Sequence, residues 1–150
     1  WLGFNLLTAF LAAAVIGLFE ATLDKIVALA ILLTIVPSMG GVAGTQSLVI
    51  ITRAIALGQI NAANAAGILR KELLVGVLNG IGWALIVSLF TYLWFGDWRI
   101  GGIIGAAMII NLVVAASAGF FIPMTLKRLK VDPALAGGVV IRTGIVAVNA

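Results

Sequence analysis

Residues 37–46 read Pro-Ser-Met-Gly-Gly-Val-Ala-Gly-Thr-Gln and lie inside a long apolar run. Such a run rarely combines proline, glycine, threonine and glutamine when it crosses hydrocarbon, because proline removes a backbone donor and kinks the helix, and glycine lets other groups come close. Polar backbone groups at membrane depth are tolerated only where protein or a watery cavity surrounds them. The stretch therefore predicts a membrane-embedded segment and is the first place to look for function.

The composition points to a membrane protein. The 150-residue chain is 63% hydrophobic and 9% charged, whereas soluble domains carry about 25% charged residues. It contains no cysteine and no histidine, which excludes a disulfide framework, thiolate chemistry and histidine-based catalysis. The net charge of +4 is explained by membrane topology and not by a nucleic-acid partner. We therefore expect an all-α integral membrane protein that is not an enzyme.

Five apolar segments are each long enough to cross about 30 Å of hydrocarbon, which takes about 20 helical residues. They cover residues 1–19, 26–52, 73–95, 100–126 and 134–150. We expect a single transmembrane domain over residues 1–150. The polar connection at residues 53–72 is compatible with a short helix lying in the interface.

The basic residues predict the orientation. Six of them lie in the two connections that follow the second and fourth segments: Arg53, Arg70, Lys71, Lys127, Arg128 and Lys130. The opposite side carries only Lys25 and Arg99. Because positive charge accumulates on the cytoplasmic side, we expect a cytoplasmic N-terminus and an external C-terminus in the inner (plasma) membrane. Trp94, Phe95 and Trp98 then form an aromatic belt at the outer interface.

The glycine-rich stretch has two interpretations. Small residues are common where membrane helices pack closely, so Gly40, Gly41 and Gly44 are explained by packing alone. Alternatively the helix is broken there, and its carbonyls together with Thr45 and Gln46 face a pore or a substrate site. The stretch is not a phosphate-binding P-loop, because it has no lysine.

The few acidic side chains also carry alternatives. Glu20 and Asp24 are either solvated acids at a helix end or a mouth that attracts hydrated cations. Asp132 is suited to cap the fifth segment, with Pro133 as its first helical residue, or to form part of a cytoplasmic cation site.

Three polar residues fall in the middle of predicted spans. Arg142 is costly there and is expected to snorkel, to pair with freed carbonyls, or to face a cavity. Asn111 and Thr143 are each explained by a hydrogen bond to a neighbouring helix.

Four stretches make the chain recognisable. They are Ile16-Gly17-Leu18-Phe19-Glu20, Ser38 to Gln46, Arg70-Lys71-Glu72-Leu73 and Asp132-Pro133-Ala134-Leu135-Ala136-Gly137-Gly138. In order and spacing the chain resembles the transmembrane domain of the MgtE family of magnesium transporters and channels, up to about Ile141.

The resemblance implies a homodimer with five helices per subunit and an ion pathway at the dimer interface. The second and fifth helices would line it, through Gly40, Gly41, Gly44, Thr45, Gln46, Thr143 and the position of Val146. Glu20 and Asp132 would attract cations at its outer and inner ends. Mg²⁺ is then the transported ion, other divalent cations are possible, and no organic cofactor is expected. The family's cytoplasmic regulatory domains are absent from these residues, so we expect the chain to be a piece of a longer protein.

The C-terminal segment departs from the family pattern. That pattern has a Thr-Thr pair and then an Asp, and these positions fall on Arg142, Thr143 and Val146. Since a hydrated divalent cation needs oxygen ligands and negative charge, magnesium selectivity is left open. Either the terminus is truncated or altered, or selectivity has changed or been lost, or carbonyls with Thr45 and Thr143 form the site alone. The alternative function is a non-conducting membrane module for assembly or sensing.

Overall fold

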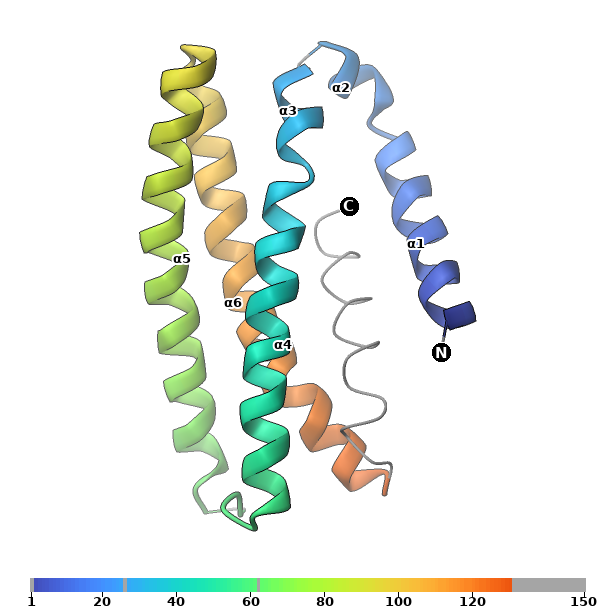
Figure 1. Cartoon of the computed structure of the whole chain (residues 1–150), viewed down its shortest axis with the longest axis vertical. Helices are drawn as coiled ribbons and strands as arrows, with labels where there is room; N and C mark the ends of the chain where they lie inside the picture. Colours follow the sequence, from blue (N-terminus) through green and yellow to red (C-terminus); the bar gives the residue numbers. More distant parts are fainter. Residues whose placement is uncertain (1, 26, 62, 131–150) are drawn as a thin grey trace.

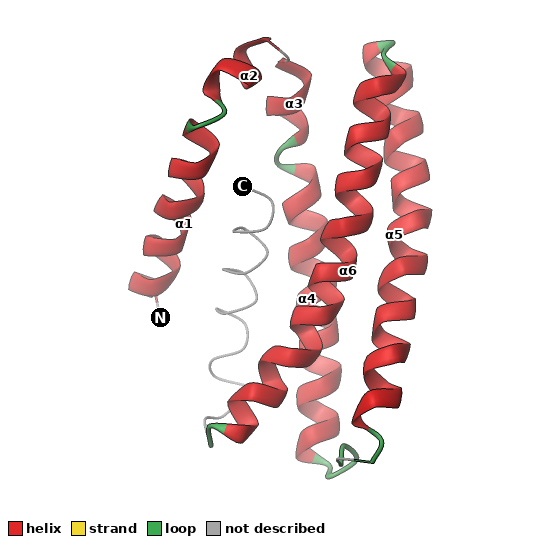
Figure 2. Cartoon of the chain, turned by 180° about the vertical axis from the view of Figure 1, so that it is seen from behind, coloured by secondary structure: helices red, strands yellow, loops and turns green. Residues whose placement is uncertain are grey.

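The structure is a computed structural model that describes residues 2–25, 27–61 and 63–130. The regular elements in these ranges are all α-helices, which confirms the predicted all-α class (Figures 1 and 2). They are α1 (Leu2–Gly17), α2 (Glu20–Lys25), α3 (Val27–Leu32), α4 (Ile35–Ala56), α5 (Ala65–Phe95) and α6 (Trp98–Arg128).

Three helical stretches in the described part are long and apolar enough to cross a membrane: Ala30–Ala56, Ala65–Phe95 and Trp98–Arg128. They correspond to the second, third and fourth predicted spans. The helix in the first predicted span, α1, has 16 residues, fewer than the about 20 that a full crossing takes. The fifth predicted span, residues 134–150, lies outside the described residues. Five spans therefore stay a prediction.

The kink that we expected at Pro37 lies before it. Pro37 has no backbone N–H to offer the carbonyl of Leu33, four residues earlier, so the helix is interrupted there and α3 and α4 are separated by a turn at Leu33 and Thr34. Oγ1 of Thr34 donates to the carbonyl of Ile31 at 3.2 Å. Pro37 itself lies in the first turn of α4, where proline is tolerated.

The connection between α4 and α5 is shorter than predicted. No separate interfacial helix forms in the described part of residues 53–72, because α4 and α5 extend into this range from both sides. Asn61 and Asn64 hold the intervening turn. Oδ1 of Asn61 accepts from the N–H of Asn64 at 3.0 Å, and Nδ2 of Asn64 donates to the carbonyl of Gln59 at 2.7 Å. Local bonds of this kind compete with helix formation.

The turn between α5 and α6 follows from two residues. Gly96 ends α5 with a left-handed φ of 71°, a conformation that costs glycine little. Asp97 begins the next helix, because its side chain accepts from the backbone N–H of Arg99 at 2.8 Å. The long helices α5 and α6 are therefore antiparallel neighbours.

α6 is the helix on which the other two long helices pack (Figure 2). Gly76, Gly80 and Ala84 recur every four residues and form the buried stripe of α5. A Cβ added to Gly76 would lie 2.8 Å from the Cβ of Ala116, and one added to Gly80 would lie 3.1 Å from the Cα of Ile109. The two backbones therefore approach as closely as small residues permit, as is usual between membrane helices.

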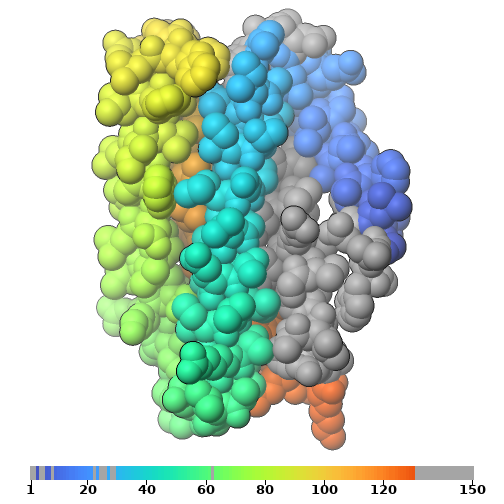
Figure 3. All heavy atoms as spheres, viewed as in Figure 1, coloured from blue at the N-terminus to red at the C-terminus, as the bar shows by residue number. Residues whose placement is uncertain are grey.

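The outward surface of α5 is apolar. Leu85, Phe90 and Leu93 are 68%, 61% and 72% exposed. Figure 3 shows α5 and α4 on one face of the molecule, and large apolar side chains are exposed on both helices. A soluble monomer rarely exposes so large an apolar surface. The exterior is that of an all-α membrane domain, with lipid in place of water.

Candidate functional site

The glycine-rich stretch is regular helix. α4 runs without interruption from Ile35 to Ala56, so the interpretation of a helix broken at these glycines is wrong (Figure 1). Oγ1 of Thr45 donates to the carbonyl of Gly41 at 2.8 Å, within the same helix. The polar groups of this stretch are therefore presented by an intact helix surface and not by an unwound backbone.

One face of the stretch packs against α6. Gly40 and Gly44 are buried, and Gly40 lies directly against the side chain of Asn111. The carbonyl oxygen of Gly44 would lie 3.0 Å from a Cβ added to Gly119. For these two glycines the packing interpretation holds within the chain, and their position gives no support to a role in a pore wall.

A second face of the stretch is open. A Cβ added to Gly41 would meet nothing within 4 Å, and the side chains of Thr45 and Gln46 are exposed. Gly41 and Thr45 lie four residues apart and so share a face of the helix, which is rotated by about 100° from that of Gly40 and Gly44. These three residues are the part of the predicted pore wall that remains accessible in the chain, and their lining of a pore stays a prediction.

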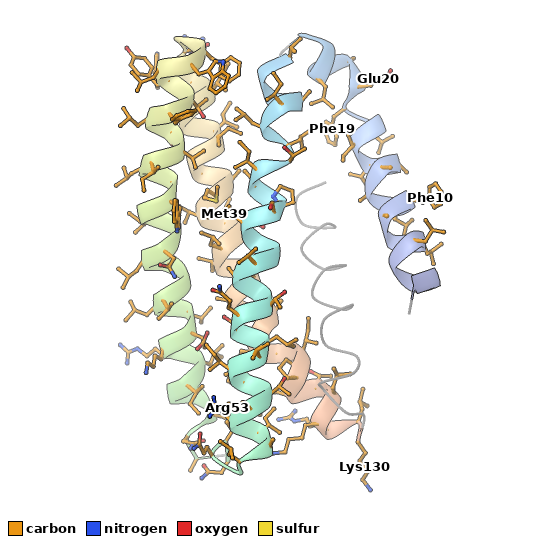
Figure 4. The ribbon with its side chains drawn as sticks, viewed as in Figure 1. Phe10, Phe19, Glu20, Met39, Arg53 and Lys130 are labelled. Atoms are coloured by element: carbon orange, nitrogen blue, oxygen red, sulfur yellow. The ribbon has the colours of Figure 1, made fainter. Side chains whose placement is uncertain are left out.

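Asn111 joins α6 to the start of α4. It is 1% exposed, and its Nδ2 donates to the carbonyl of Val36. The prediction of a hydrogen bond from Asn111 to a neighbouring helix is confirmed. The bond lies next to Pro37, so the first turn of α4, which follows the interruption at Leu33 and Thr34, is held by a side chain of α6. Met39, less than one turn further on, packs against the adjoining apolar core (Figure 4).

A polar link that sequence reasoning missed joins α4 to α5. Oγ of Ser47 donates to Oε2 of Glu72 at 2.9 Å, and both side chains are half-buried. Glu72 was expected in a connection, because Arg70 and Lys71 precede it, whereas it lies in the eighth position of α5. The available signal was the acid itself, since a carboxylate inside a membrane helix needs a partner.

Thr52 lies on the side of α4 that Gly41 and Thr45 occupy. It lies seven residues after Thr45, hence on the same side of the helix. Its hydroxyl oxygen is buried and has no hydrogen-bond partner within the described ranges. The seven-residue spacing of Thr45 and Thr52 was readable in the sequence, although the burial of the Thr52 hydroxyl was not.

The predicted cation-attracting acids are only partly described. Glu20 begins α2, is exposed, and lies at the end of the molecule opposite Arg53 and Lys130 (Figure 4). In the described part of the chain no three Asp, Glu, His or Cys residues come together as a metal site. A role for Glu20 in cation capture therefore stays a prediction. Asp132 lies outside the described residues, as do Arg142, Thr143 and Val146.

The two ends of the helices differ in charge. The end that holds the α4–α5 turn carries exposed basic side chains from all three long helices and the residues that follow them: Arg53, Arg70, Lys71, Lys127, Arg128 and Lys130. The end that holds α2 and the α5–α6 turn carries Glu20, Asp97 and Arg99. At that end Trp94 and Trp98 are each 71% exposed. This distribution is compatible with the predicted orientation, which stays a prediction; Phe95, the third residue of the predicted belt, packs against the core.

Comparison with known proteins shows the family of this chain. A family model described as the MgtE divalent cation transporter matches residues 33–145. The chain is similar to the magnesium transporters MgtE of Bacillus subtilis, with 29% identity, of Enterococcus faecalis, with 31%, and of Thermus thermophilus, with 29%. Each match extends over 143 residues, which are 95% of this chain and 32% of the relative. The chain therefore spans about a third of the length of these proteins.

Proposed function

Because this chain belongs to the MgtE family of divalent cation transporters, we propose that it is the membrane part of a pathway for Mg²⁺. In this proposal two copies of the chain, with five spans each, enclose the pathway at their interface. Ions move passively, and no chemical energy source is required. The inside-negative potential favours inward movement by about 4.6 kcal/mol per 100 mV for a divalent ion, twice the value for a single charge.

The observation that carries the proposal is the open polar face of α4. Gly41 leaves space at its surface, and Thr45 and Gln46 are exposed next to it. The hydroxyl of Thr45 already donates to the carbonyl of Gly41 in the same helix, whereas the exposed amide of Gln46 is costly in an apolar span unless other protein or water surrounds it. A second copy of the chain supplies both, since two such faces opposed across an axis enclose a polar channel.

The polar face suits a hydrated ion better than a bare one. Mg²⁺ sheds its water reluctantly and keeps several water ligands in most protein sites. Hydroxyl and amide groups such as those of Thr45 and Gln46 accept and donate hydrogen bonds, so they can contact the water shell. The absence of a cluster of acidic ligands among the described residues is compatible with recognition through water.

The proposed orientation has the basic end in the cytoplasm. The N-terminus is then cytoplasmic and, with five spans, the C-terminus is external. Glu20 lies at the outer end, where an acid raises the local concentration of cations. Asp132 follows the basic end of α6 in the sequence and would act at the inner end. The membrane concerned is the cell's inner, or plasma, membrane.

A substitution on the polar face tests the proposal. Thr45→Val removes a hydroxyl from the face but keeps the size of the side chain. Thr125→Val on α6 is the matched control, because both threonines are exposed and each donates to the carbonyl four residues earlier at 2.8 Å. We expect Mg²⁺ uptake into liposomes to fall several-fold for Thr45→Val and to remain unchanged for Thr125→Val. Equal uptake by both variants would show that Thr45 does not face the ion.

The same measurement separates transport from the alternative function. The unaltered chain, reconstituted as a dimer, should take up Mg²⁺ in proportion to the imposed potential. A dimer that takes up no Mg²⁺ at any potential would favour a non-conducting module. Arg142 and Val146, at positions where the family resemblance implies a Thr and an Asp, support that alternative.

A further inference from the structure

A side-chain hydrogen bond crosses between two helices that make few backbone contacts with each other. α4 and α5 each pack on α6. Across the space between them, Oγ of Ser47 donates to Oε2 of Glu72 at 2.9 Å. Glu72 lies about 10 Å along α5 from its first residue, at about 1.5 Å per residue. A half-buried carboxylate is costly unless it is hydrogen-bonded, so the partner of Glu72 is informative.

The bond lies where α4 comes close to α6. A Cβ added to Gly119 of α6 would lie 2.5 Å from the Cβ of Ser47. At this level α4 is therefore pressed against α6 on one side and tied to α5 by the carboxylate on another. The carboxylate therefore adds to the packing on α6 a contact in a second direction, which opposes rotation of α4 about its axis.

The rotation of α4 decides where its polar face points. Thr45 precedes Ser47 by two residues, which corresponds to about 200° around a helix of 3.6 residues per turn. A bond that holds Ser47 toward α5 therefore holds Thr45 on nearly the opposite side. Met39 and Ala43 precede Ser47 at four-residue intervals, and both pack against the core on the same side.

We propose that Glu72 is a positioning residue for the ion pathway: through Ser47 it sets the rotation of α4, and with it the direction of Thr45 and Gln46. The inference rests on the proposed function, in which that face of α4 lines the pathway. Glu72 acts as a hydrogen-bond acceptor and not as a ligand of the ion. A neutral glutamine, whose amide oxygen also accepts from a hydroxyl, can therefore replace it, whereas alanine cannot.

Four variants test the role by Mg²⁺ uptake per folded protein in liposomes. We expect Glu72→Ala and Ser47→Ala each to lower uptake by about 3- to 18-fold, the factor that corresponds to the free energies of interhelical hydrogen bonds in membranes. The double variant should be no worse than either single variant, because both remove the same bond. Glu72→Gln should restore uptake to near the unaltered level.

Ser117→Ala is the matched control. Ser117 is also half-buried, but its Oγ donates at 2.7 Å to the carbonyl of Val113 in its own helix. This bond ties no two helices together, so its loss should leave uptake unchanged.

A second readout reports rotation without relying on transport. The sequence contains no cysteine, so Thr45→Cys is a unique label site for a charged, water-soluble thiol reagent. We expect Glu72→Ala to change the labelling rate at position 45 at least about threefold, and Glu72→Gln to leave it unchanged. Thr125→Cys on α6, labelled in the same backgrounds, should react at a constant rate.

The outcomes separate the inference from the proposed function. If Glu72→Gln is as damaging as Glu72→Ala while Ser47→Ala is silent, Glu72 acts through its charge and the inference is wrong. If the variants lose only thermal stability, with uptake and labelling unchanged, the bond is merely structural and the inference is again wrong. If the unaltered chain takes up no Mg²⁺, the proposed function fails, and the labelling rates still decide whether Glu72 sets the rotation of α4.

Discussion

Two adjacent glycines, Gly40 and Gly41, should respond in opposite ways to the same substitution. A Cβ at Gly40 would collide with the side chain of Asn111, whereas a Cβ at Gly41 would meet nothing within 4 Å. Both changes replace glycine by alanine within α4, which by itself favours the helix by about 1 kcal/mol. The difference between the two variants therefore isolates the packing of α4 on α6.

The loss of stability expected for Gly40→Ala follows from the displacement of the Asn111 side chain. Overpacking a tight interface costs about 1–3 kcal/mol. Moving Asn111 also breaks its bond to the carbonyl of Val36, and interhelical bonds in membranes contribute about 0.6–1.7 kcal/mol. After the gain in helix propensity, Gly40→Ala should be less stable than the unaltered chain by about 1–4 kcal/mol. Gly41→Ala should be more stable by up to about 1 kcal/mol.

The assay is reversible unfolding in mixed micelles, with helix content followed by circular dichroism as the denaturing detergent is increased. The two alanine variants should differ by about 2–5 kcal/mol, with Gly40→Ala the weaker. Gly40→Ala combined with Asn111→Ala, which removes the obstructing side chain, should recover part of the loss. Equal stability of Gly40→Ala and Gly41→Ala would refute the assignment of these glycines to different faces.

Two further predictions concern the ends of the helices. Asp97→Ala should destabilise the fold by about 1 kcal/mol, because the side chain caps α6 by accepting from the N–H of Arg99; Asp97→Asn, which keeps an acceptor, should recover most of that stability in the same detergent titration. The double change Arg142→Thr with Val146→Asp should raise Mg²⁺ uptake several-fold over the unaltered chain. It introduces the Thr and the Asp that the family resemblance implies at these positions, and so removes a positive charge and adds an oxygen ligand. Uptake that is already as high without the double change would show that the missing acid is dispensable.

The features that could be predicted from the sequence are those that depend on the composition or on one residue of a helix. The low charge and the long apolar runs predict an all-α membrane protein because hydrocarbon leaves few other structures. A bond from Asn111 to a neighbouring helix was predictable for the same reason, since a buried amide needs a partner. An interruption of the helix by Pro37 was predicted, but at the wrong place. A proline removes the hydrogen bond to the carbonyl four residues before it and leaves its own turn intact.

The sequence could not give the contacts between helices. We expected Arg70, Lys71 and Glu72 in the polar connection before the third span, yet α5 begins at Ala65 and runs through them. A helix can extend past the hydrocarbon into the interface, where long charged side chains are tolerated. The pairing of Glu72 with Ser47 depends on how α4 and α5 are placed on α6, and no local pattern encodes that placement.

The glycine-rich stretch presents a packed face and an open face in the same turns of α4, so the packing interpretation does not exclude a functional one. Its small residues form two interleaved pairs with a spacing of four, Gly40 with Gly44 and Gly41 with Thr45. Residues four apart share a face, and neighbouring residues lie about 100° apart, so one helical segment presents both faces at the same depth. The first pair lets α4 lie against α6, and the second is then left to face whatever lies beyond it. Close packing on one side is thus a condition for a defined polar surface on the other, because a loosely held helix would not keep Thr45 in one direction.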